Sequence, residues 1–235
     1  DDAFRGLACT PLLRYSHSNL RFARTLLAWG DAMTELQALR DAYRQHKAAL
    51  LASLQAQGAS TRGIHVLLRK FSRLADGLLT TLWQRAGLPP GLTLAAVGGF
   101  GREQLFPHSD IDVLVLLPTD LPAPDTVREQ VEAFIRSCWD AGLEIGSSVR
   151  SVEECLSEAA NDVTVQTSLL EARRICGDAA LFAQFEHQFG AQLDPHAFLV
   201  AKTLEMRQRH TKHENTPYAL EPNCKESPGG LRDLH

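Results

Sequence analysis

Two carboxylates at alternate positions of one predicted strand are the strongest chemical signal in the chain. Asp110 and Asp112 flank Ile111 and lead into an apolar run that ends at Leu117. Strand side chains alternate between faces, so both carboxylates point to the same side, where their like charges repel and raise one pKa. Divalent cations between them would remove that repulsion, and Mg²⁺ prefers carboxylate oxygens and substrate phosphates. The pair therefore predicts a metal site for two Mg²⁺ ions.

A glycine cluster precedes the carboxylate pair. Gly98, Gly99 and Gly101 follow directly on an apolar run, residues 92–97, that predicts a buried strand. Without Cβ atoms, the backbone N–H groups of such a turn can approach a phosphate closely. A phosphate cradle beside a metal-binding pair is what nucleotidyl transfer by two metals requires. The alternative is a Gly-rich turn between two buried strands, with Asp110 as a solvated turn residue.

These residues carry a family resemblance. Two glycines, a spacer and Asp-hydrophobic-Asp resemble the DNA polymerase β type nucleotidyltransferase superfamily. The longer string VGGFGREQLFPHSDIDVLVLL, which begins at Val97, resembles the bacterial PII uridylyltransferase/uridylyl-removing enzymes of nitrogen regulation. Segments 143–150, 169–178 and 218–234 follow the pattern of the same family, so the resemblance covers most of the chain.

The resemblance implies a multifunctional enzyme that transfers UMP from UTP to a tyrosine of the PII signal protein and releases pyrophosphate. Enzymes of this family also carry an HD phosphohydrolase domain, which removes uridylyl groups, and ACT domains, which sense glutamine; this sequence contains neither. It starts at Asp1 and stops within the motif around 229–233, so we expect a fragment of a longer protein. Two alternatives are a nucleotidyltransferase with another acceptor, such as a small molecule or an antitoxin-type target, and a non-catalytic nucleotide-sensing module.

Further candidate site residues lie outside the central stretch. Polymerase-β-like sites commonly use a third acidic residue on the next strand, and Glu144 is the candidate; the alternative is a solvated strand carboxylate. Arg102 is positioned to reach a β- or γ-phosphate, or is an exposed arginine at a helix start. Ser109 is a phosphate donor or a turn serine. Lys225 and Arg232 belong to a polar tail, fixed by Pro and Gly, that either approaches the nucleotide or forms an interdomain hinge.

Composition excludes several classes of protein. The chain has 235 residues and a net charge of −4 with histidines neutral, so nothing indicates a dedicated nucleic-acid binder. No apolar run reaches membrane-spanning length. The five cysteines are widely spaced without a C-x-x-C pair, which is typical of reduced thiols in a cytoplasmic protein. His210 and His213, one helical turn apart, form only a weak metal signal beside the alternative of a solvated helix face.

The periodicities predict an α+β fold, a polymerase-β-like nucleotidyltransferase core with flanking helical regions. We expect an N-terminal helical region at 1–59, the core at 60–180 and the start of a helical accessory region at 181–235. The core is expected to be a small mixed sheet with helices on one side. Strands are predicted at 92–97, up to residue 117 after the carboxylate pair, and at 143–149. Helices are predicted at 19–57, 125–140, 161–176, 178–189 and 194–212. Another helix is predicted to begin at residue 60 or 61 and to stop at Gly87, and a capping box of Ser151 and Glu154 predicts the start of one more. The tail after residue 212 is predicted to be mainly loop.

Overall fold

The computed structural model describes residues 34–53, 60–120, 124–218, 221 and 223–234. Residues 34–53 are helical, which confirms that part of the helix predicted at 19–57; the remainder lies outside the described residues. None of the described helices is both long and apolar enough to cross a membrane.

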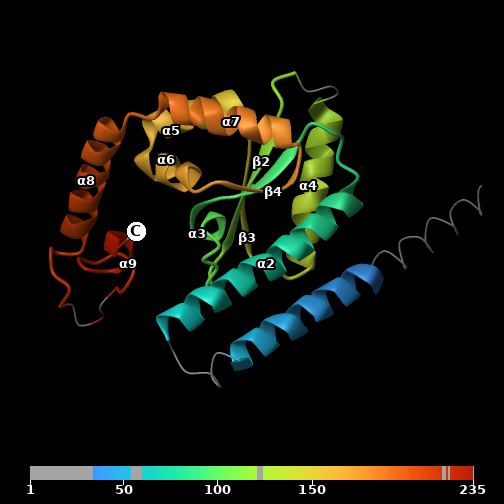
Figure 1. The fold of residues 1–235 in the computed structure, drawn as a ribbon, viewed down its shortest axis with the longest axis horizontal. Helices are drawn as coiled ribbons and strands as arrows, with labels where there is room; N and C mark the ends of the chain where they lie inside the picture. The colour runs from blue at the N-terminus through green and yellow to red at the C-terminus, as the bar shows by residue number, and fades with distance from the viewer. Residues whose placement is uncertain (1–33, 54–59, 121–123, 219–220, 222, 235) are drawn as a thin grey trace, which may run out of the picture.

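A mixed sheet forms the centre of the molecule, as predicted, but it has four strands where the sequence indicated three (Figure 1). Its order is β3-β2-β1-β4, with β1 antiparallel to both neighbours and β2 parallel to β3. The register places Asp112 opposite Gly146. The carboxylate strand therefore lies between the strand that enters the glycine turn and the strand that follows Glu144. The strands are β1 (Thr93–Ala96), β2 (Ile111–Leu117), β3 (Ile145–Ser151) and β4 (Arg173–Gly177).

Helix ends follow the capping residues that the sequence predicted. Ser60 caps α2, Ser151 and Glu154 form a complete capping box on α5, and Asp194 caps α8 with Pro195 in the first turn. Gly87 ends α2 with a φ of 60°. The helices are α2 (Thr61–Ala86), α3 (Gly98–Gly101), α4 (Pro124–Asp140), α5 (Val152–Asn161), α6 (Val163–Leu170), α7 (Ala179–Gln192), α8 (Pro195–Lys212) and α9 (Leu231–Leu234).

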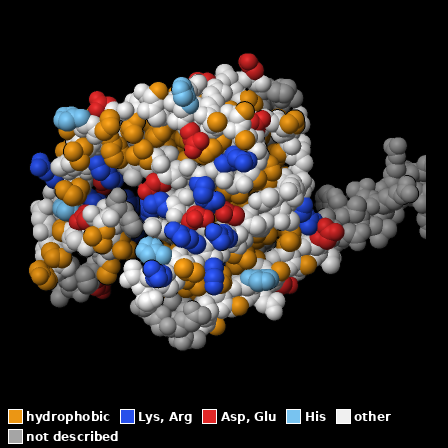
Figure 2. Space-filling model, in the orientation of Figure 1, with side chains coloured by type: hydrophobic (Ala, Val, Ile, Leu, Met, Phe, Trp, Pro, Cys, Tyr) orange, Lys and Arg blue, Asp and Glu red, His pale blue; other side chains and the backbone are white. Residues whose placement is uncertain are grey.

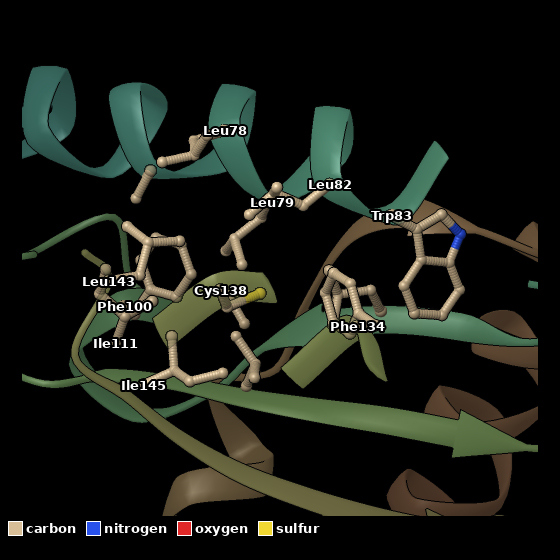
Figure 3. Close-up of a cluster of buried hydrophobic side chains, with 14 of the residues drawn as sticks. Leu78, Leu79, Leu82, Trp83, Phe100, Ile111, Phe134, Cys138, Leu143 and Ile145 are labelled. Carbon is tan, nitrogen blue, oxygen red and sulfur yellow. The ribbon is translucent and has the colours of Figure 1, made fainter. Parts of the chain in front are cut away.

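Helices cover both faces of the sheet, so the prediction of helices on one side is wrong (Figure 1). Leu94 and Val113 pack with α2 and α4, whereas Ala95 and Leu114 pack with α5, α6 and α7. Strands β1 and β2 are apolar at nearly every position, which is the pattern of strands buried on two faces. Figure 3 shows the core between the sheet and helices α2 and α4. In it, the rings of Trp83 and Phe134 pack edge to face, with 5.3 Å between their centroids.

The helix predicted at 161–176 is also wrong in its second half. Helix α6 ends at Leu170, and the chain continues as β4, which pairs with the free edge of β1. Arg173 of β4 donates to both carboxylate oxygens of Asp76 on α2, at 3.0 and 3.1 Å, and this long-range contact cannot be read from helical periodicity. Strand β3 begins at Ile145, two residues later than predicted.

Candidate active site

The carboxylate pair lies at the start of β2. Asp112 is the second residue of β2, and Asp110 is the residue directly before the strand begins. The backbone of Asp112 is fixed because its carbonyl accepts a hydrogen bond from the Val97 N–H at 3.1 Å. Partial desolvation of the carboxylate and the nearby charge of Asp110 raise the pKa of Asp112, and Lys225 opposes the increase. The two acids are thus close enough to interact, as the alternation predicted.

Two glycines lie beside the Asp112 carboxylate, and a serine lies near one of them. A Cβ at Gly98, where φ is +57°, would lie 4.0 Å from Asp112 Oδ2 and 3.7 Å from Ser168 Oγ. A Cβ at Gly146 would lie 2.6 Å from Asp112 Oδ1, so this glycine makes room for the carboxylate itself. Sequence reasoning missed Ser168, because it lies on α6 in a segment with no motif of its own.

The glycine turn folds as α3, a single helical turn that follows β1. Gly101 N–H donates to Val97 O, and Arg102 N–H donates to Gly98 O. The first N–H groups of a helical turn have no acceptor within it, so those of Gly98 and Gly99 can serve a phosphate. A Cβ at Gly101 would lie 1.9 Å from the carbonyl oxygen of Glu171, so only glycine lets this turn pack against the end of α6.

Arg102 lies beside the glycine turn, but it already has protein partners. Its guanidinium is ion-paired with Glu171, and its Nε donates to Gln104 Oε1 at 3.1 Å. An arginine held in this way contributes positive charge near the cradle. Contact between Arg102 and a phosphate stays a prediction.

Glu144 directly precedes β3, and its carbonyl accepts a hydrogen bond from the Ile111 N–H at 2.8 Å. It lines a small pocket together with Ser109, Tyr43 and Lys47. Burial and the charge of Glu144 raise the pKa of Tyr43 to about 12. Within the described ranges, no three His, Cys, Asp or Glu side chains form a group of metal ligands, so Glu144 is not gathered with the pair. The roles of Glu144 as third ligand and of Ser109 as phosphate donor stay predictions.

The tail returns to the carboxylate pair. Lys225 lies near enough to Asp112 for its charge to favour the ionised carboxylate. Arg232 pairs with Glu226 at 2.9 Å. Figure 2 shows a hollow between the tail and the body of the molecule, with Lys and Arg side chains at its edge. The role of Lys225 and Arg232 in nucleotide binding stays a prediction, and the charge effect of Lys225 on Asp112 supports it for Lys225.

The weak metal signal of His210 and His213 has another explanation. The His210 ring contacts the Asp233 carboxylate at 2.8 Å, and His213 forms the C-cap of α8. Neither belongs to a metal-ligating group in the part of the chain that the structure describes.

Comparisons with known proteins agree with this geometry. Residues 79–175 match the family model of the nucleotidyltransferase domain, and residues 197–235 match that of the GlnD PII-uridylyltransferase. The part of the chain that resembles a nucleotidyltransferase domain thus includes the glycine turn and the carboxylate pair.

The particular relatives are bacterial. The chain is 57% identical over 192 residues to the bifunctional uridylyltransferase/uridylyl-removing enzyme of Burkholderia mallei (strain ATCC 23344), and equally so to that of Burkholderia pseudomallei (strain K96243). The matched residues are 82% of this chain and 22% of each relative, so the chain spans about a fifth of the length of these proteins. The resemblance that the motifs predicted is confirmed.

Proposed function

We propose that this chain transfers UMP from UTP to a tyrosine of the PII signal protein and releases pyrophosphate. The observation that carries the proposal is the position of Asp110 and Asp112 beside the Gly98–Gly99 turn, within a nucleotidyltransferase domain. The choice of UTP and of PII rests on the family model matched by residues 197–235 and on the names of the relatives.

The residues present fit a divalent metal. Burial, and after it the neighbouring charge of Asp110, raises the pKa of Asp112, and a bound cation would favour the ionised carboxylates instead. Mg²⁺ is usually held by one or two carboxylates and by substrate phosphates rather than by a protein cage. We assign Asp110 and Asp112 as ligands, with Glu144 as a third candidate. Two bound Mg²⁺ ions would lower the pKa of the attacking hydroxyl and stabilise charge on the α-phosphoryl group.

The chain's own residues position the nucleotide. We assign the N–H groups of Gly98 and Gly99 to the β- and γ-phosphates. Ser168 Oγ lies 3.7 Å from the position of a Cβ at Gly98, so we expect it to border the same space. The tyrosine oxygen forms a bond to the α-phosphorus, the bond from that phosphorus to the bridging oxygen breaks, and pyrophosphate leaves with the bond's electrons. The proton of the tyrosine hydroxyl passes to solvent water in this step. Holding both reactants in line lowers the barrier of such a transfer substantially.

A cytoplasmic location is part of the proposal. The thiols of Cys138 and Cys155 are buried and unpaired with each other, and burial raises their pKa to about 12 and about 11. Such thiols are protonated and unreactive at neutral pH, as is common in reduced intracellular proteins.

One labelling experiment tests the function. The chain is incubated with Mg²⁺, PII and each of the four α-³²P-labelled ribonucleoside triphosphates in turn. We expect label on PII from UTP alone, and none with the chain's Asp112→Asn variant or with PII whose acceptor tyrosine is phenylalanine. Label on another molecule would indicate a different acceptor. Nucleotide binding without any transfer would indicate a sensing module and contradict the proposal.

A further inference from the structure

A polar network fastens the tail to α8. The Asp233 carboxylate accepts hydrogen bonds from Arg209 at 2.8 Å, from the Gly229 N–H at 2.7 Å, and contacts the His210 ring at 2.8 Å. Arg209 is only 8% exposed, and it also donates to the Glu226 carbonyl at 3.0 Å. Burial would raise the pKa of Asp233, but the bonds from His210, Gly229 and Arg209 outweigh it and lower that pKa to about 2. Asp233 is therefore an ionised hub between α8 and the tail.

The same network fixes the turn that carries Lys225. The Asn223 side chain accepts from the N–H groups of Lys225 and Glu226, both at 3.0 Å. From the other side, the Arg232 N–H donates to the Lys225 carbonyl at 3.1 Å. Since Arg232 directly precedes Asp233, the backbone of Lys225 is linked to the hub within one residue. The Lys225 side chain itself remains exposed.

The tail that carries Lys225 faces the candidate active site. The tail and α9 lie across the hollow from α3 (Figures 1 and 2). In the metal-free chain, the charge of Lys225 favours the ionised form of the Asp112 carboxylate. Once cations neutralise the carboxylates, the favourable partner for a fixed ammonium group at the rim is the charged end of a triphosphate.

We propose that Asp233 is a positioning residue, which holds the tail turn on α8 so that Lys225 binds the β- and γ-phosphates of the nucleotide. Lys225 touches the substrate, whereas Asp233 acts only through it. This inference rests on the proposed function in one respect, that the site binds a nucleoside triphosphate. It adds a contribution to nucleotide binding from a segment outside the sheet domain.

Binding experiments on the whole 235-residue chain test the inference. Affinities for α,β-imido-UTP, which cannot transfer its nucleotidyl group, and for UMP are measured with Mg²⁺ by calorimetry. We expect Lys225→Met to weaken the triphosphate analogue about tenfold or more, as for loss of one charge-assisted hydrogen bond, while UMP affinity holds. Lys225→Arg should restore most of the affinity. Asp233→Asn should weaken binding of the triphosphate analogue and leave UMP binding unchanged. In the Lys225→Met background it should cause little further loss of affinity, because both changes remove the same interaction.

Matched controls separate positioning from general loss of charge. Lys212→Met and Glu214→Gln change exposed residues at the end of α8 and should bind like the wild type. If Asp233→Asn does not fold, His210→Gln replaces it in the double-mutant cycle with Lys225→Met, because it removes only the contact between His210 and Asp233. Unchanged analogue affinity in folded Lys225→Met overturns the inference and leaves the proposed function intact. Full additivity of the two changes, equal loss of UMP binding, or equal loss in the controls overturns the role of Asp233. A wild-type chain that binds no triphosphate contradicts the proposed function itself.

Discussion

At the scale of single residues, the site is defined by what surrounds Asp112. Gly146 leaves space for one oxygen of its carboxylate, Gly98 lies beside the other oxygen, and the charge of Lys225 in the tail favours the ionised form. Burial and the charge of Asp110 raise the pKa of Asp112, so the ionised carboxylate is disfavoured in the metal-free chain. A site of this kind trades stability of the metal-free protein for affinity toward metal.

Replacing either acid tests this trade. Asp110→Asn or Asp112→Asn should abolish transfer, because each removes a metal ligand. The metal-free protein should unfold at the same or a higher temperature, because a like-charge repulsion is relieved. Activity assays and thermal unfolding of the chelated protein measure both. Near wild-type activity in both variants would sink the metal assignment.

The raised pKa of Asp112 also predicts a pH dependence. Metal binding needs the ionised carboxylate, so affinity should fall, as pH decreases, at a higher pH than for an ordinary aspartate. Stability of the metal-free chain should show the opposite sign: the folded state holds the proton more tightly, so stability decreases as pH rises from the ordinary pKa through the raised one.

Lys225→Met should move the midpoint for Mn²⁺ binding to higher pH, because Lys225 opposes the increase in pKa. Titration of Mn²⁺ binding against pH measures it, with Lys212→Met as the control. Coincident midpoints for wild type and Lys225→Met would show that the two groups do not interact.

At the scale of elements, local signals were predictable and long-range ones were not. The capping box at Ser151, the cap at Asp194 and the stop at Gly87 depend on neighbouring residues only. Strand β4 depends on the free edge of β1 and on Asp76, which is 97 positions before Arg173. For the same reason, Asp110 and Asp112 could be predicted from a local motif. Ser168 could not, because it comes near Gly98 only through the packing of α6 against α3.

Substitution of Gly99 in the glycine turn tests the proposed phosphate cradle. A side chain at Gly99 would meet only Gln104 O and Arg102 at 3.7 and 3.8 Å, so Gly99→Val should fold. We expect it to weaken nucleoside triphosphate binding about tenfold or more, by keeping phosphate from the backbone. Gly190→Val, in open space on α7, is the control. Unchanged affinity in folded Gly99→Val would mean that the cradle lies elsewhere.

Two other glycines make a prediction about stability. At Gly101 a Cβ would lie 1.9 Å from a backbone carbonyl, so Gly101→Ala must separate α3 from α6, at a cost of about 2 kcal/mol or more. At Gly77 on α2, nothing lies within 4 Å, so Gly77→Ala should stabilise by about 0.5–1 kcal/mol. Denaturant unfolding of both variants measures the difference. Equal stability would show that the contact of α3 with α6 yields at little cost.

At the scale of the whole molecule, two regions meet at one hollow. The sheet with its two helical layers provides the carboxylates and the glycine turn, and the tail after α8 provides Lys225. The boundaries at 1–59, 60–180 and 181–235 stay a prediction. The nucleotidyltransferase family model matches residues 79–175, so the proposed contribution of Lys225 comes from outside the matched residues.

The last prediction concerns the reverse reaction of this chain. In the resembled family, hydrolysis of uridylyl-PII is assigned to an HD domain with adjacent His and Asp, and this sequence contains no His-Asp dipeptide. Reversal of the proposed transfer at the carboxylate site would need pyrophosphate as the attacking group and would regenerate UTP. We therefore expect the purified chain to release PII from its modified form only when pyrophosphate is added, and expect that release to disappear in Asp110→Asn. Chromatography of the released nucleotide decides between the routes, since reversal yields UTP and hydrolysis yields UMP. UMP formed without pyrophosphate, and still formed by Asp110→Asn, would reveal a second, hydrolytic site in this chain.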